Sequence, residues 1–171
     1  MWYAPMAALN WLNALETPAS QADISPMTDA YSSAVLRLAA DIPHLGRLEA
    51  PDASVRRVSR ICGSALTLDL KLDEAGRIAA LGLEVEACAL GQASASVFAA
   101  NAIGADKAEI LAGRDQLKAM LQDNGPVPGG RFAALGALEG ARDYRQRHGS
   151  ILLAFEAGVE AMDAAREAGA A

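Results

Sequence analysis

Residues 65–72 place the strongest constraint on the fold, because apolar and polar side chains alternate there without a break. One face of this stretch carries Leu66, Leu68, Leu70 and Leu72, and the other carries Thr67, Asp69 and Lys71. Such a period of two is typical of an antiparallel strand with one buried and one solvent-facing side. The stretch therefore needs a partner strand, and a layer of side chains must cover its leucine face.

The partner strand follows directly along the chain. Residues 73–76 read Asp-Glu-Ala-Gly, which is a turn sequence, and a second alternation begins beyond them. Its apolar face carries Leu81, Leu83, Val85 and Ala87. A shorter strand is expected around residues 55–60, which completes a three-stranded antiparallel sheet.

Helical periodicity flanks these strands on both sides. An apolar stripe precedes them and ends at Pro43, with members Tyr31, Ala34, Val35, Leu38 and Ile42. After residue 88 comes a helix of small side chains. A further helix is opened by Asp106 and Glu109 in the pattern of a capping box. Beyond the turn-forming residues 124–130, two more helical stretches are expected. This order indicates an α+β fold in which helices cover one face of the sheet.

The expected core combines the apolar faces of the strands and helices. It comprises Leu66, Leu68, Leu70, Leu81, Leu83, Val85, Ala93, Val97, Ile151 and Phe155. The chain has 171 residues, which is enough for one compact domain. We assign this domain to residues 27–171.

Residues 1–26 differ in character from the rest. They contain both tryptophans of the chain, Trp2 and Trp11, followed by a stretch of Pro, Ser and Gln. We interpret them as an N-terminal extension that folding does not require, or as the result of a misassigned start upstream of Met27. The alternative is a short amphipathic helix around residues 7–15 that packs onto a partner.

Composition excludes several classes of protein. The net charge of −6 argues against a nucleic-acid surface, which needs a basic face. No apolar run approaches the roughly 20 residues that span a bilayer. The N-terminus lacks the basic region and the long apolar core of a signal peptide, so a cytoplasmic location with reduced cysteines is expected. No nucleophile–base or acid–base pair can be identified, which argues against an enzyme.

The two cysteines are the residues best suited to chemistry. Cys62 lies just before the first long strand, and Cys88 lies just after the second. Both are about a dozen residues from the turn between these strands, so they fall at the same end of the hairpin. Two thiols supply half of a usual tetrahedral metal site, and the alternative is that both are buried structural residues.

The sequence around these cysteines resembles the iron–sulfur cluster scaffold family of IscU, SufU and the N-terminal part of NifU. Cys62-Gly63 followed by an alternating strand is similar to the Cys-Gly-Asp opening of that family. Residues 87–96 resemble its Gly-Cys-x-x-x-x-Ala-Ser-Ala-Ser signature, with Cys88 in register. Tyr31 and residues 43–46 resemble its entry segment. Residues 147–152 resemble the segment that carries its third cysteine.

The resemblance also implies which side chains hold the cargo. Three cysteines bind a transient cluster in the family, and an aspartate helps it to leave. Here Ser64 stands at the aspartate position, and the third cysteine position falls on Gly149 or Ser150. The implied ligands are Cys62 and Cys88 for a cluster. For a metal ion, iron or zinc, His148 and Ser150 join them.

The resemblance further implies a function. The protein would receive sulfur from a cysteine desulfurase, assemble or carry an iron–sulfur cluster, and pass it to acceptor proteins. The alternative is a non-catalytic paralogue that binds a metal ion or a protein partner without building clusters. A third hypothesis is a redox protein with a reversible disulfide between Cys62 and Cys88.

Overall fold

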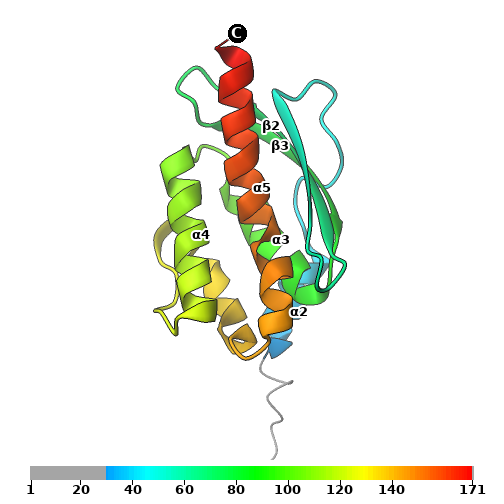
Figure 1. The fold of residues 1–171 in the computed structure, drawn as a ribbon, viewed down its shortest axis with the longest axis vertical. Helices are drawn as coiled ribbons and strands as arrows, with labels where there is room; N and C mark the ends of the chain where they lie inside the picture. Colours follow the sequence, from blue (N-terminus) through cyan, green and yellow to red (C-terminus); the bar gives the residue numbers. More distant parts are fainter. Residues whose placement is uncertain (1–29, 171) are drawn as a thin grey trace, which may run out of the picture.

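The computed structural model of the protein describes residues 30–170. Its helices and strands follow one another in the order that the sequence predicts (Figure 1). Among the named elements of the described residues, one helix precedes three strands, and four helical segments follow them. The elements are α2 (Ser33–Ala40), β1 (Ala53–Val58), β2 (Ala65–Leu72), β3 (Ile78–Glu86), α3 (Ala89–Asn101), α4 (Lys107–Gln122), the 3₁₀ segment η2 (Gly130–Ala141) and α5 (Arg145–Gly169). The predicted α+β class is confirmed.

The three strands form one antiparallel sheet in the order β1-β2-β3. Leu68 in the central strand faces Val55 of β1 and Leu83 of β3, so apolar residues lie in register across the sheet. Leu68 and Leu83 are fully buried. The predicted core is confirmed residue by residue, except that Val85 is only half-buried, near the end of β3.

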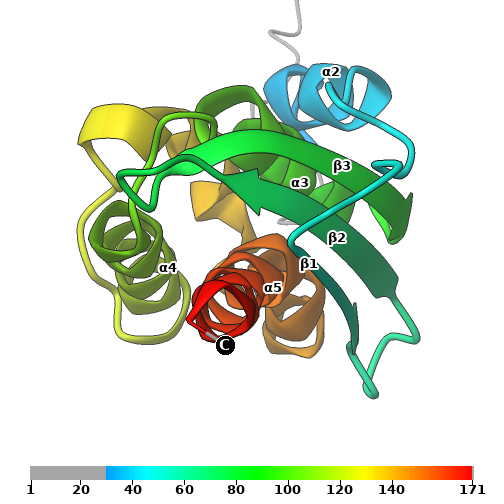
Figure 2. The ribbon, with the colours of Figure 1, turned by 90° about the horizontal axis from the view of Figure 1, so that it is seen from above.

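Helices cover the leucine face of this sheet (Figure 2). The long helix α5 packs against β1 and β2, and both α3 and α4 pack against α5. Phe155 lies at the centre of this layer, where its ring meets those of Phe98 and Phe132 edge-on at centroid distances of 5.2 and 5.0 Å. Gly113 allows α4 to lie close against this aromatic cluster, because a Cβ at that position would lie 2.6 Å from the Phe132 ring.

Residues 43–52 cross the opposite face of the sheet, and we call this segment the strap. It pairs with the outer edge of β3, where the amide of Gly46 donates to the carbonyl of Leu83 at 2.8 Å. It then passes over Gly82, where a Cβ would lie only 2.5 Å from the carbonyl oxygen of Gly46. A side chain at Gly82 would therefore block the crossing.

The strap corrects one expectation about the polar face of β2. Asp69 was expected to face solvent, but its side chain is fully buried beneath the strap. The guanidinium of Arg47 donates to its two carboxylate oxygens at 2.7 and 2.9 Å, and the amide of Leu48 donates at 3.0 Å. These hydrogen bonds lower the pKa of Asp69 below its ordinary value against the opposing effect of burial, which raises it.

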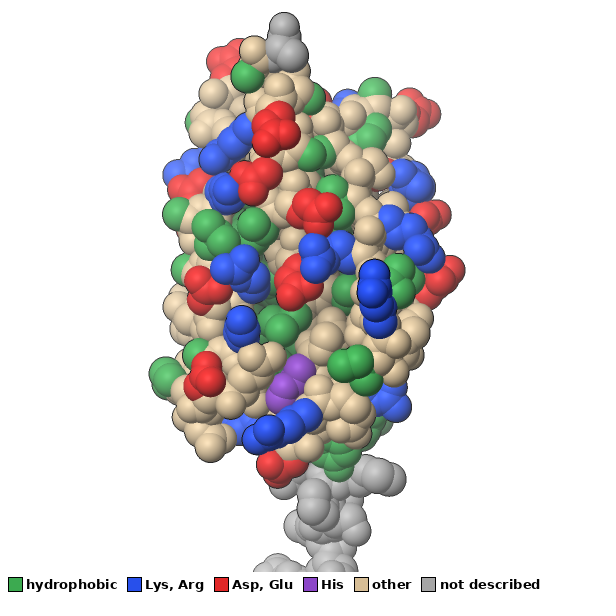
Figure 3. All heavy atoms as spheres, in the orientation of Figure 1, with side chains coloured by type: hydrophobic (Ala, Val, Ile, Leu, Met, Phe, Trp, Pro, Cys, Tyr) green, Lys and Arg blue, Asp and Glu red, His purple; other side chains and the backbone are tan. Residues whose placement is uncertain are grey.

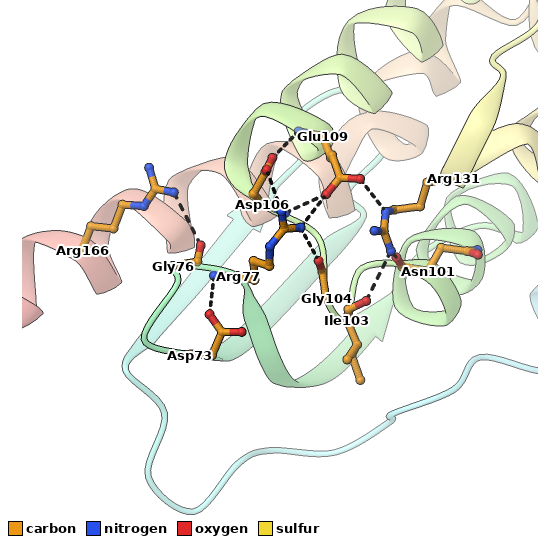
Figure 4. Close-up of polar contacts among 10 residues, drawn as sticks. All are labelled: Asp73, Gly76, Arg77, Asn101, Ile103, Gly104, Asp106, Glu109, Arg131 and Arg166. Atoms are coloured by element: carbon orange, nitrogen blue, oxygen red, sulfur yellow. Dashed lines mark hydrogen bonds and ion pairs between the residues drawn. The ribbon is translucent and has the colours of Figure 1, made fainter.

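A second polar cluster joins the β2–β3 turn to the helices (Figure 4). Arg77 donates to the carbonyl oxygen of Gly104 at 2.9 Å and lies 3.4 Å from the carboxylate of Glu109. Glu109 also accepts from Arg131 at 3.1 Å and forms the predicted capping box with Asp106. The turn, the start of α4 and the start of η2 are thus held together.

The surface over α4 and α5 mixes charges of both signs (Figure 3). Arg57 pairs with Glu156 and Glu160 of α5, and Lys107 pairs with Asp163. No helix within residues 30–170 is long and apolar enough to cross a membrane. The N-terminal extension assigned to residues 1–26 lies outside the described residues.

Candidate cluster site at the cysteine end of the sheet

Cys62 is held in a tight loop between β1 and β2. The amide of Ser59 donates to the carbonyl of Ser64 at 2.8 Å, and the amide of Gly63 donates to the carbonyl of Ser59 at 2.9 Å. Gly63 has a φ of 70°, in the left-handed region that glycine adopts without strain. The turn therefore favours glycine at position 63, and it leaves the Cys62 side chain half-buried at the end of the sheet.

Cys88 lies where β3 ends and α3 begins. It is the N-cap residue of α3, with extended backbone, and its side chain makes no capping hydrogen bond. The thiol is half-buried and is not part of a disulfide. A side chain at a helix N-cap faces the free amide groups of the first turn, where negative charge is favoured.

Two serine hydroxyls lie between the thiols and connect them. The Sγ of Cys62 lies 3.3 Å from the Oγ of Ser64, and this oxygen accepts from the Oγ of Ser150 at 3.0 Å. The Oγ of Ser150 lies 3.5 Å from the Sγ of Cys88. A third hydroxyl, that of Ser59, lies 3.1 Å from the Cys62 sulfur. Ser59, Ser64 and Ser150 are all buried, so this hydroxyl cluster forms the floor beneath two more accessible thiols.

Two glycines leave the space for this cluster. A Cβ on Gly91, in the first turn of α3, would lie 2.2 Å from the Oγ of Ser150. A Cβ on Gly149 would lie 2.7 Å from the Oγ of Ser59. Both helices can therefore bring their first turns onto the loop that carries Cys62.

The surroundings of Cys62 favour its thiolate form. Burial raises the pKa of this thiol, but hydrogen bonds from the hydroxyls of Ser59 and Ser64 lower it by more. The backbone of Ser64 and the hydroxyl of Ser150 contribute in the same direction, and the pKa falls from 9.0 to about 7. A substantial fraction of Cys62 is therefore ionised at neutral pH, and the thiolate is the form that binds metal and attacks electrophiles.

His148 is positioned differently from the other predicted ligands. It is buried, and its Nε2 lies 3.1 Å from the carbonyl oxygens of both Ala141 and Arg142. Nitrogen must donate to approach carbonyl oxygens, which fixes the proton on Nε2 and leaves the Nδ1 lone pair available. Neither thiol lies within hydrogen-bond distance of this ring in the described part of the chain.

The donor set is sparse for a metal centre. Within residues 30–170 no group of three or more His, Cys, Asp or Glu side chains could hold a metal ion. The available set is two thiols with the Ser150 hydroxyl beside Cys88. It fits a cargo bound through two thiolates and completed by external ligands such as sulfide, and it does not fit a closed four-residue site.

Sequence reasoning identified some of these residues and missed others. Of the residues it named, Cys62, Cys88 and Ser150 are brought together, whereas His148 contacts the end of η2. Of the two positions considered for the third cysteine, Ser150 directs its hydroxyl at the thiols, while Gly149 makes room for Ser59. The role of Ser59 was missed, because only the loop geometry brings it back to Cys62, three residues away.

Known proteins match this chain over most of its length. The family described as NifU-like N-terminal domain matches residues 30–150. Among curated proteins, none matches at a significant level. A crystal structure of a nitrogen-fixing NifU-like protein (N-terminal) from Brucella abortus is 43% identical, with a TM-score of 0.81, over 84% of this chain and 99% of that one.

Two further solved structures have the same fold. A hypothetical protein is 26% identical over 76% of this chain and 94% of its own, with a TM-score of 0.69. FiSufU, assigned as an iron–sulfur cluster assembly scaffold protein for the SUF system of the thermophilic Fervidobacterium islandicum AW-1, shares 21% identity. It covers 78% of this chain and 96% of its own with a TM-score of 0.71, which is evidence for the fold alone.

The family match covers well over half of the chain, and the Brucella structure aligns along nearly its whole length. The family's scaffolds are typically non-catalytic, and their partners are cysteine desulfurases and iron–sulfur acceptor proteins. Having only two cysteines marks the chain as divergent. The chain belongs to the NifU-like N-terminal domain family, the group of iron–sulfur cluster assembly scaffolds that includes IscU and SufU.

Proposed function

We propose that this protein is an iron–sulfur cluster scaffold or carrier that binds iron or a cluster transiently and passes it to acceptor proteins. One observation supports this most strongly. Two accessible thiols, one before β2 and one after β3, meet at the same end of the hairpin over one buried hydroxyl cluster. Such convergence is unnecessary for packing, because buried structural cysteines would be served equally well by apolar neighbours.

The proposed ligands are Cys62 and Cys88, with Ser150 beside them. Cys62 is the thiol prepared for ionisation, so it binds iron or accepts sulfur from a cysteine desulfurase at neutral pH. Ser150 supplies a hydroxyl, which is a weak ligand because its proton is hard to remove. His148 joins the set only through Nδ1, since Nε2 is engaged with two carbonyl oxygens. Weak ligation on one side suits a cargo that must leave.

The test is anaerobic reconstitution with ferrous iron and sulfide, followed by absorption spectroscopy and metal analysis. We expect thiolate-to-iron absorption bands with stoichiometric iron and sulfide in the wild type. Cys62→Ala and Cys88→Ala should lack them. A wild type that retains neither iron nor sulfide would contradict the scaffold function, and iron retained without sulfide would favour the alternative described below.

A gain-of-function variant sharpens this test. Ser150→Cys places a third thiol beside Cys88, with the same position and nearly the same size. We expect a more stable cluster that transfers to an acceptor protein more slowly. Gly149→Cys is the matched comparison at the other candidate position for the third cysteine, where a Cβ would lie 2.7 Å from the Oγ of Ser59.

A second function is favoured by the substitutions within the site. Ser64 stands where the family resemblance implies an aspartate, and Gly149 or Ser150 stands where it implies the third cysteine, which suits a paralogue that binds one metal ion or a protein partner. Zinc or iron bound at one equivalent through Cys62 and Cys88, with no sulfide retained, is the result expected for this alternative.

A further inference from the structure

A groove lies between α2, α3 and η2, away from the thiols. Its volume is about 570 Å³. Small side chains dominate its lining, with Ala34 from α2, Ser96 and Ala100 from α3, and Ala134 and Ala137 from η2. Ala100 and Ala134 are exposed although they point into a largely apolar surface. The described part of the chain thus offers a groove with room for a large side chain.

The chain itself continues from one wall of this groove. The helix α2 begins at Ser33 and contributes Ala34, Arg37 and Leu38 to the lining. The 29 residues that precede the described part of the chain are therefore tethered next to the groove. A tether of this length gives an effective concentration on the order of millimolar, so even weak apolar contacts suffice for docking.

The side chains of the tethered segment complement the groove in size. Both tryptophans of the chain, Trp2 and Trp11, lie in residues 1–29. Trp11 belongs to an apolar stretch, residues 7–15, that also contains Leu9, Leu12 and Leu15. Large aromatic side chains bury much area against a floor of alanines.

The charges are complementary as well. Residues 1–29 contain three acidic side chains, Glu16, Asp23 and Asp29, and neither Lys nor Arg. At the rim of the groove Arg37 is exposed and forms no ion pair with any residue in the described range. Asp41 also lines the groove, so the acidic side chains of residues 1–29 are attracted only to the side of the groove that carries Arg37.

We propose that residues 7–15 dock into this groove of the same chain, with Trp11 as the inserted side chain. This inference is independent of the cluster function, because the groove contains neither cysteine.

Tryptophan fluorescence tests the proposal directly, since both tryptophans of the chain lie in residues 1–29. In the full chain carrying Trp2→Phe, Trp11 is the sole reporter. We expect its emission maximum at shorter wavelength than in a peptide of residues 1–29 with the same substitution. Acrylamide quenching should be severalfold weaker in the chain. Peptide-like emission and quenching would overturn the proposal.

Matched variants identify the groove as the docking site. Ala100→Arg in this background should move Trp11 emission to the peptide value, and Ala134→Arg should do the same from η2. Ala112→Arg, at an exposed alanine of α4 outside the groove, should change nothing. Circular dichroism melting verifies that all three variants fold. Equal emission in all three, or a shift that disappears on dilution and so reports a second copy, would overturn the assignment.

Discussion

The two ends of the β2–β3 hairpin satisfy their polar groups in opposite ways. At the turn end, Arg77 and Arg131 pair with Glu109 and also donate hydrogen bonds to backbone carbonyls (Figure 4). At the other end, two thiols and the hydroxyl cluster make weak contacts and contain no ion pair among themselves. The charged groups of the turn end find their partners within the protein, whereas the two thiols of the cysteine end can still bind a ligand from outside. This difference predicts separate effects on stability and on binding.

The largest effect is expected from removing either thiol. Cys62→Ala and Cys88→Ala should each abolish Zn²⁺ binding measured by isothermal titration, because one thiolate and a hydroxyl make a poor site. Unfolding by urea should change little, since both thiols are half-buried. Wild-type affinity in both variants would leave the thiols as packing residues and remove the contrast between the two ends.

Truncation in the centre of the sheet should affect stability instead. Leu68→Ala removes a fully buried side chain between β1 and β3, and we expect a loss of roughly 2–5 kcal/mol in the free energy of unfolding. The measurement is the urea midpoint at constant slope. An unchanged midpoint would contradict the buried position of the central strand.

Acidification should weaken metal binding at the cysteine end only. The folded pKa of Cys62 is lowered to about 7, so its thiolate is present above pH 7 and is lost as the pH falls through that value. Protons then compete with the metal, and affinity should fall by about tenfold per pH unit for each thiol that must ionise. Zn²⁺ titrations between pH 5.5 and 8 measure this. A Zn²⁺ affinity that does not change over this pH range would contradict binding through the Cys62 thiolate.

The turn end should respond to the loss of its helix cap. Asp106→Ala removes the side chain that accepts from the amide of Glu109 at 2.9 Å, and a lost cap costs about 1 kcal/mol. We expect a lower urea midpoint and unchanged Zn²⁺ affinity. Asp115→Ala, on the exposed surface of α4, is the control with the same change of charge. A Zn²⁺ affinity that falls with Asp106→Ala would show that the two ends are coupled.

The smallest effect on folding is expected from removing residues 1–26. We propose that residues 27–171 form the folding unit, and a chain beginning at Met27 should melt within a few degrees of the full chain. Insolubility, or a much lower melting temperature, would show that the segment belongs to the core or to an oligomer interface.

The regular parts of this fold were predictable from sequence because their signals are local. Alternation in residues 65–72 gave the central strand and its buried face, and the Asp106–Glu109 pair gave the start of α4. The helical stretch after residue 130 was also expected, but its 3₁₀ geometry was not, since helical periodicity does not separate the two types in short segments.

The errors arose where distant segments meet. The alternating pattern of β2 predicts that Asp69 is exposed. Its side chain is buried only because the strap, which carries Arg47, lies over it. At the candidate site the family resemblance located both cysteines, and hairpin counting put them at one end. The choice between Gly149 and Ser150 depended on how α5 rotates against the Cys62 loop, which one sequence alone does not specify.

The strap also has a consequence for the order of folding. Its residues leave the ribosome before β2 and β3, yet they rest on the outer edge and face that those strands create together. The strap can therefore close only after the hairpin has formed. Until then the carboxylate of Asp69 lacks its hydrogen bonds to Arg47 and Leu48, and the edge of β3 is free to pair with other chains. Slow closure would thus make the newly made protein most vulnerable to misassociation just after its sheet is complete.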